Sequence, residues 1–241
     1  MPVNTEEALA LLRAQADEGR RASAERLGVP AENSLGVPTA VLRRLAKRLG
    51  RSDALARGLW ESGWHEARLL AALVCEPEGL ARAEVERMMG EVASWDLCDH
   101  LCKELVIKRG DWEGFMRAWA EEDGVYKKRA AFALIAAAAV HRAPLPMEKV
   151  EGYLAFIRAH ARDSRPHVKK AASWAIRELG KSGPAEREAA LAAAREMLSG
   201  GDRALAWAAR DAIRELESCV CVEGVRRLVP AGGKMASRAG K

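Results

Sequence analysis

Apolar residues recur along this chain at intervals of three and four positions, and no window alternates apolar and polar residues over the length of a strand. This spacing is typical of amphipathic α-helices that bury one face. Prolines and capping residues mark where the helices begin. The pattern therefore predicts an all-α protein. We expect helices over residues 5–16, 22–27, 39–49, 52–60, 64–74, 79–89, 95–108, 112–120, 126–141, 147–161, 166–179, 184–198, 203–216 and 218–228.

Every second helix starts at a similar interval along the chain. The starts at Trp64, Trp95, Tyr126, Pro166 and Arg203 are separated by 31, 31, 40 and 37 residues. The segments "KRAAFALI", "KKAASWAIREL" and "RALAWAARDAIREL" share a basic residue followed by small residues and then a bulky apolar one. A helix pair that recurs every 30 to 40 residues predicts a curved α-solenoid of HEAT-like units. An irregular helical bundle is the alternative, because the period drifts.

Residues 1–229 form one predicted domain, and the stretch 230–241, "PAGGKMASRAGK", has no helical period. We expect this basic tail to be disordered. The N-terminal "MPVNTEEALALL" carries acids where an export signal needs positive charge, and the five cysteines have no framework spacing. These features predict a cytoplasmic protein, which we expect to be monomeric. The apolar run over residues 130–140 is too short to span a bilayer and predicts a buried helix.

Basic residues open several predicted helices, where the helix dipole disfavours positive charge. They are Lys127, Lys128 and Arg129 in one helix, Lys169 and Lys170 in a second, and Arg203 in a third. A helix start with added cations is a good phosphate site, because backbone N–H groups and side chains face the same anion. The net charge of +5 permits such a partner. We expect these cations, together with Arg43, to line one basic concave face, whereas solvated helix starts balanced by nearby acids are the plain alternative.

The stretch "SWDLCDHLC", residues 94–102, concentrates side chains that carry chemistry. With Ser94 as N-cap, the cysteines Cys98 and Cys102 fall inside an apolar stripe with Leu101 and Leu105, where free cysteine is commonly a small buried hydrophobe. His100 points away from both cysteines, and no second ligand pair completes a metal site. We therefore expect no metal and no other cofactor.

Trp95 and Asp99 lie one helical turn apart at the edge of that stripe. An aromatic face beside a carboxylate suits a cationic ligand. Ordinary packing and capping explain the same pair, so the residues alone leave both interpretations open.

Four segments carry a resemblance to a known family. "NSLGVPTAVLRRLAK", "SWDLCDHL", "YKKRAAFAL" and "HVKKAASWAIRELGK" resemble, in this order and spacing, the AlkD-type alkylpurine DNA glycosylases of the DNA alkylation repair family. The resemblance implies a solenoid of about six HEAT-like repeats. It also implies metal-free excision of cationic purines, such as 3-methyladenine and 7-methylguanine, from double-stranded DNA in base excision repair, without the usual insertion of the lesion into a pocket.

By position, Trp95 and Asp99 match the tryptophan and aspartate of the family's catalytic face. Arg129 matches its arginine and Trp174 its second tryptophan. An N-alkylated purine leaves without a general acid, so a carboxylate that stabilises the sugar cation and orients a water suits the chemistry. The resemblance thus implies catalytic Asp99, Trp95 and Trp174, and DNA contacts by the cations named above.

Three positions depart from the family pattern. Leu27 stands where an aromatic residue is common, Ser94 replaces a tryptophan before the Trp–Asp pair, and Cys98 is unusual at its position. Two further functions therefore stay open: a catalytically silent DNA-binding member of the family, and a scaffold for protein interactions.

Overall fold

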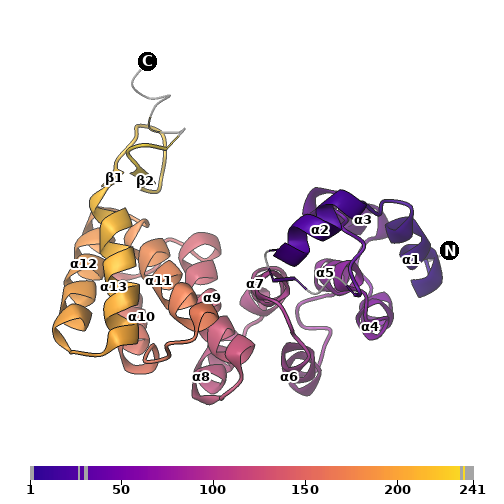
Figure 1. Ribbon diagram of the computed structural model, residues 1–241, viewed down its shortest axis with the longest axis horizontal. Coiled ribbons are helices and arrows are strands. Elements are labelled where there is room, and N and C mark those ends of the chain that lie inside the picture. Colours follow the sequence, from indigo (N-terminus) through magenta and orange to yellow (C-terminus); the bar gives the residue numbers. More distant parts are fainter. Residues whose placement is uncertain (1–2, 27, 30–31, 234–235, 237–241) are drawn as a thin grey trace. The chain divides into compact units, whose positions relative to one another are not determined.

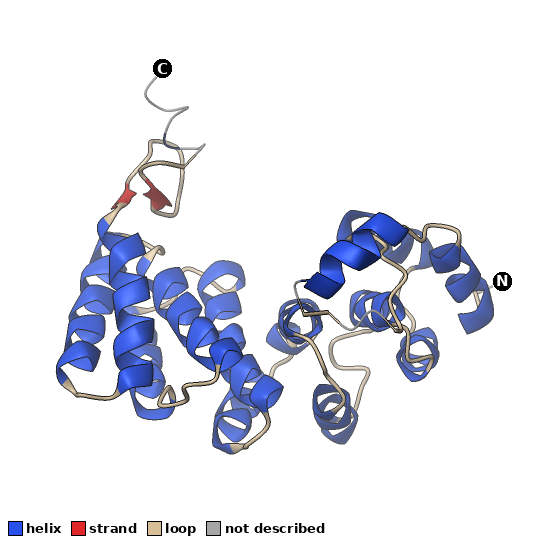
Figure 2. Ribbon diagram, in the orientation of Figure 1, coloured by secondary structure: helices blue, strands red, loops and turns tan. Residues whose placement is uncertain are grey.

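The computed structural model describes residues 3–26, 28–29, 32–233 and 236, and these form two compact units, 1–112 and 113–241. Helices make up nearly all of the regular structure in this part of the chain (Figures 1 and 2). Unit 1 holds α1 (Thr5–Arg13), α2 (Glu18–Arg26), α3 (Thr39–Leu49), α4 (Asp53–Glu61), α5 (His65–Val74), α6 (Arg82–Gly90), α7 (Trp95–Glu104) and the 3-10 turn η1 (Val106–Lys108). Helix α8 (Trp112–Glu121) begins at the boundary and leads into unit 2.

Unit 2 continues with α9 (Val125–His141), α10 (Met147–His160), α11 (Pro166–Gly180), α12 (Pro184–Ser199) and α13 (Arg203–Glu217). A short antiparallel pair, β1 (Cys219–Val220) with β2 (Val229–Pro230), follows α13. The all-α prediction is confirmed, and the predicted helix boundaries over most of the chain lie within a few residues of these.

The repeat is visible in the polar contacts between successive repeats. In unit 1, side chains bond to residues 31 positions away, as in Trp60 to Glu91 and His65 to Asp96. In unit 2 the same kind of contact spans 38 positions, as in Ser173 to Asp211. Equivalent points on successive helices can only meet in this way if the helices run parallel. Helices α3, α5 and α7 therefore stack side by side in unit 1, and α9, α11 and α13 do so in unit 2.

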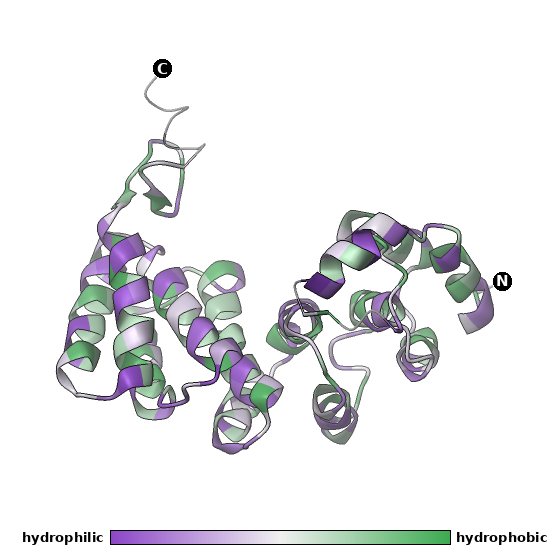
Figure 3. Cartoon of the chain, in the orientation of Figure 1, coloured by the Kyte–Doolittle hydropathy of each residue, from purple (hydrophilic) through white to green (hydrophobic). Residues whose placement is uncertain are grey.

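Small residues allow close packing in unit 2. Helix α9 is buried along its whole middle, from Arg129 to Ala139, and alanine fills most of these positions. At Gly180 an added Cβ would lie 2.8 Å from a methyl of Leu216 and 3.0 Å from that of Ala190. Figure 3 shows apolar and polar residues mixed around the helices of each unit, as amphipathic elements require. No helix in the described ranges combines the length and apolarity that a bilayer crossing needs.

Two predicted elements differ from the structure. The helix expected over 218–228 is wrong: Cys219 pairs with Pro230 and Val220 with Val229 in β1 and β2. Closely spaced β-branched valines favour extended backbone in this segment, and Gly224 turns it with a φ of +74°. Pro230, the first residue of the predicted tail, thus lies in β2; residues 234–235 and 237–241 of that tail lie outside the described residues.

The second helix begins earlier than predicted, at Glu18. The reason is Asp17, whose Oδ1 accepts the backbone N–H of Arg20 at 3.0 Å and so caps the first turn. Leu27, one of the departures from the family pattern, lies outside the described residues.

Candidate active site and nucleic-acid interface

The first turn of α7 carries the predicted catalytic pair. Ser94 is the N-cap residue with extended backbone, as expected, but its buried hydroxyl makes no capping hydrogen bond. The predicted apolar stripe of Cys98, Leu101, Cys102 and Leu105 is fully buried. Trp95 and Asp99 flank this stripe and are half-buried, so part of each side chain reaches solvent. The helical period thus places an indole and a carboxylate together at the surface of unit 1.

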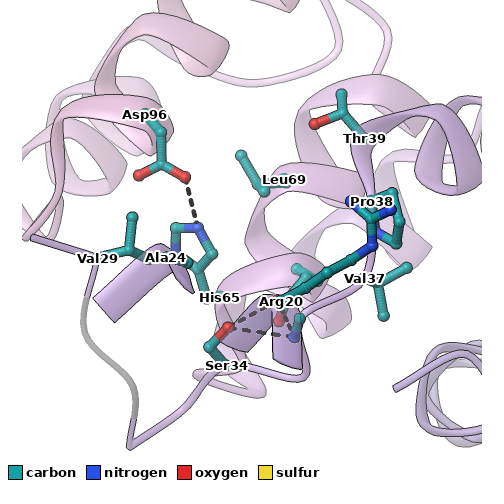
Figure 4. A pocket seen from close by; sticks show the side chains of 12 residues that line it. Arg20, Ala24, Val29, Ser34, Val37, Pro38, Thr39, His65, Leu69 and Asp96 are labelled. Carbon is teal, nitrogen blue, oxygen red and sulfur yellow. Dashed lines mark hydrogen bonds and ion pairs between the residues drawn. The ribbon is translucent and has the colours of Figure 1, made fainter. Parts of the chain in front are cut away.

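Asp96, in the first turn of α7, contacts α5. His65 Nε2, at the start of α5, lies 2.8 Å from Asp96 Oδ2 (Figure 4). Burial alone would raise the pKa of Asp96, but the hydrogen bond and charge of His65 outweigh it and bring this pKa below its ordinary 3.8. Asp96 is therefore ionised at neutral pH and anchors α7 to α5. Its position in the first turn also suits the helix dipole.

This anchor makes stability depend on pH. Because the pKa of Asp96 is lower in the folded chain, its ionised form stabilises the fold above about pH 4, and this stability is lost as the pH falls further. Asp96→Asn is expected to lower the free energy of unfolding at pH 7 by roughly 1.5–3 kcal/mol, the size of a hydrogen bond to a charged group. Urea denaturation at pH 7 and pH 3 measures the free energy of unfolding. The difference in this free energy between variant and parent should be smaller at pH 3. An equal difference at both pH values would show that the ionisation of Asp96 does not contribute to stability. Glu76→Gln, which changes an exposed carboxylate, is the control.

The side chain of His100, also on α7, contacts the backbone of α5. Its Nε2 lies 3.0 Å from the backbone oxygen of Leu69 on α5. Burial lowers the pKa of His100 to about 4, so the imidazole is neutral at physiological pH. Among the residues that the structure describes, no group of three His, Cys, Asp or Glu side chains could hold a metal ion.

A cavity of about 270 Å³ lies beside the His65–Asp96 pair (Figure 4). Arg20 from α2, Thr39 from the start of α3 and Leu69 also line it. Glu66, 3% exposed, closes one wall, and its carboxylate accepts three hydrogen bonds from the loop that precedes α3. The donors are Ser34 Oγ at 2.8 Å, Leu35 N at 2.8 Å and Gly36 N at 2.7 Å. This carboxylate therefore fixes the path of the chain into α3.

Arg43, predicted to contact DNA, is paired within unit 1. It lies 2.5 Å from Glu104 of α7, and Lys108 lies 3.1 Å from the same carboxylate. Burial would raise the pKa of Glu104, but Arg43 and Lys108 hold it below the usual range. Helix α3 also exposes Arg44, Lys47 and Arg48, which form no hydrogen bond or ion pair within the described ranges. The free positive charge of α3 thus lies mainly on residues that the sequence analysis did not select.

In unit 2 the predicted cations gather at one end of three parallel helices. Lys127 and Lys128 open α9, Lys169 and Lys170 open α11, and Arg203 opens α13. Lys127 lies 2.8 Å from Glu122, whereas Lys128, Lys170 and Arg203 have no ion pair in the described part of the chain. Within this unit the structure brings the predicted cations of neighbouring repeats to the same end.

Arg129 differs from its neighbours because it is buried, with 7% of its surface exposed. Its Nη1 donates a 2.8 Å hydrogen bond to the backbone oxygen of His167, which lies in the first turn of α11. The guanidinium thus joins α9 to α11 and sets the position of the helix that carries Trp174. Little of its surface is left for a phosphate.

Trp174 lies half-buried on α11, and no ring or cation contact covers its indole among the described residues. It belongs to unit 2, whereas Trp95 and Asp99 belong to unit 1.

A family model described as "DNA alkylation repair enzyme" matches residues 8–216 of this chain. The chain belongs to the DNA alkylation repair enzyme family.

The fold agrees with this assignment. A solved structure reported under "A new family of proteins related to the HEAT-like repeat DNA glycosylases with affinity for branched DNA structures" superimposes with a TM-score of 0.72. The sequence identity is 14%, and the match covers 98% of this chain and 94% of that one. At this identity the likeness shows the fold, a helical HEAT-like repeat. No curated protein matches the chain.

The sequence did not reveal the two residues that fix the elements around the Trp95–Asp99 pair. His65 and Glu66 give no motif, because their partners lie 30 to 32 positions away and belong to other elements. One signal was available. A histidine at a helix start and an aspartate one repeat later, 31 positions on, are placed to meet if the helices stack in parallel.

Proposed function

We propose that this protein is a DNA glycosylase that hydrolyses the N-glycosidic bond of cationic N-alkylated purines in duplex DNA. The observation that carries the proposal is the Trp95–Asp99 pair, half-exposed on α7 in a chain of the DNA alkylation repair enzyme family. Asp96 of the same turn contacts His65 and so fixes α7 against α5, the scaffold on which this pair lies.

Hydrolysis of this N-glycosidic bond requires few catalytic groups. Alkylation makes the purine a cation, so the base leaves as a neutral molecule when the bond between its nitrogen and C1′ breaks. Positive charge then develops on the sugar, and a carboxylate stabilises it. A water adds to C1′ and gives up a proton, for which Asp99 is the acceptor. No general acid is needed, which agrees with the neutral and inward-facing His100.

The cations at the starts of α9, α11 and α13 support DNA as the substrate. Free N–H groups of a helix start and adjacent lysines together suit phosphate oxygens. A protein-interaction scaffold gives no reason for unpaired cations to recur at equivalent helix ends.

A catalytically silent DNA-binding protein is the second candidate. The observation that favours it is the structural neighbour named above, for which affinity for branched DNA is reported. The deciding experiment incubates the protein with methylated duplex DNA and measures the released bases by chromatography. Release of 3-methyladenine and 7-methylguanine faster than the spontaneous loss supports the glycosylase, and release at the spontaneous rate together with tight DNA binding supports the silent protein.

Trp174 allows a sharper prediction. Its uncovered indole suits a cationic nucleotide, and a cation–π contact is worth roughly 0.5–2 kcal/mol. Trp174→Ala is therefore expected to reduce excision of 7-methylguanine about 2- to 30-fold at limiting DNA, with a smaller loss of affinity for undamaged duplex. Rates from single-turnover kinetics and dissociation constants from fluorescence anisotropy give the comparison. Equal losses on both substrates would assign Trp174 to folding or to general DNA contact.

A further inference from the structure

The helix starts of unit 2 carry one pattern twice. A basic residue is followed four positions later by tryptophan and three positions after that by arginine: Lys170, Trp174 and Arg177 on α11, and Arg203, Trp207 and Arg210 on α13. At 3.6 residues per turn, each set falls on one face of its helix. The recurrence indicates a second surface of the same kind.

The two helices are parallel neighbours. Ser173 Oγ of α11 donates a 2.6 Å hydrogen bond to Asp211 of α13, and Arg177 pairs with Glu215 one turn further on. On α13, Trp207 is half-buried, whereas Arg203 and Arg210 are exposed. The face with Trp207 is therefore open to solvent and lies next to the face with Trp174.

The charge on this face is uncompensated. Arg203 and Arg210 form no hydrogen bond or ion pair within the residues that the structure describes. Two other cations of this region are paired, Arg214 with Asp211 and Lys181, the residue after α11, with Glu215. Unpaired exposed arginines on either side of an aromatic ring suit a polyanion, because neither guanidinium must break an existing pair to bind it.

The two tryptophans differ in one respect. The ammonium of Lys169 lies 4.8 Å from the ring centre of Trp207, so this indole already holds a cation of the protein. The indole of Trp174 holds none among the described residues. A positively charged lesion gains little at an occupied aromatic face. The contact through Trp207 must then be the same for damaged and undamaged DNA.

We propose that Trp207 and Arg210 extend the DNA contact of Lys169 and Arg203 along α13, and that these four residues, the α13 surface, bind the sugar–phosphate backbone of undamaged duplex. In this arrangement Trp207 is a positioning residue that holds the Lys169 ammonium toward a phosphate, and the two arginines bind neighbouring phosphates. The proposal rests on the proposed function only in that DNA is the ligand; it does not require that the bond be cleaved.

The test measures binding of an unmodified duplex, and of the same duplex with one 7-methylguanine, by fluorescence anisotropy over a series of salt concentrations. The double variant Arg203→Gln/Arg210→Gln should weaken both complexes and flatten the log–log salt dependence by about 1.8, since each lost phosphate contact contributes about 0.9. Trp207→Leu should weaken both complexes equally, by about 2- to 5-fold, as expected for loss of one exposed cation–π contact.

Arg158→Gln/Arg195→Gln is the matched control, because these exposed arginines lie on α10 and α12 and are paired with Glu196 and Glu217. An unchanged salt slope in the double variant, or the same flattening in the control, would overturn the proposal. A loss confined to the alkylated duplex in Trp207→Leu would also overturn it, since the contact would then read the lesion. If circular dichroism shows that Trp207→Leu does not fold, the salt dependence of Arg203→Gln/Arg210→Gln still tests the proposal. A parent that releases no base but binds duplex through these arginines would contradict the glycosylase and leave the α13 surface supported.

Discussion

Asp99→Asn is expected to slow the release of 7-methylguanine from duplex DNA by roughly 100- to 1,000-fold, because one group that stabilises developing charge is typically worth about 3–4 kcal/mol in the transition state. The substitution keeps the shape of the side chain and removes its negative charge. Affinity for the duplex should hold or increase, since a carboxylate near phosphates repels them before the bond breaks. Single-turnover excision and anisotropy binding separate the two effects.

Asp96→Asn is the control for this experiment. Asp96 lies on the same turn of α7 but is bound to His65, so its amide variant should lose stability and keep most of the excision rate. A parental rate of release in Asp99→Asn would remove Asp99 from the mechanism. If the parent itself released bases no faster than they are lost spontaneously, the silent DNA-binding protein would be the better description.

Glu66→Gln is expected to lower the free energy of unfolding by roughly 3 kcal/mol, because an isosteric amide cannot accept all three of the hydrogen bonds that the buried carboxylate now receives. The amide N–H₂ would face backbone N–H groups of the loop, leaving at least one donor without a partner. The same loop packs closely at Gly36, where φ is +72° and an added Cβ would lie 2.1 Å from the Asp17 backbone oxygen.

Urea denaturation followed by tryptophan fluorescence measures this loss, and limited proteolysis tests whether the link between α2 and α3 opens first. Glu76→Gln again serves as control, because that carboxylate is exposed. A change below about 1 kcal/mol would mean that the loop is held by other contacts, since a single surface substitution stays within about half of that value.

Local chemistry explains why the helices could be predicted from the sequence. The caps and prolines that begin α3, α4, α11 and α12 act within one turn, and the period of apolar residues acts within each helix. The spacing of Trp95 and Asp99 needs only the helical period as well. The segment 218–228 shows where this reasoning fails: contacts between β1 and β2, and the bonds of Arg227 to Ala139 and Glu178, decide its conformation.

The sequence by itself thus determined the helical class, the repeat and the pair of side chains on α7, because each depends on neighbours within a few positions. The curvature of the solenoid and a single concave basic face stay predictions. Only the tertiary structure decided that Arg129 is buried against α11, that His65 binds Asp96 and that Lys169 covers Trp207. These contacts join residues 31 to 38 positions apart, and they depend on how far each helix is rotated and shifted against the next. That packing results from the fit of many buried side chains at once, which no local pattern records.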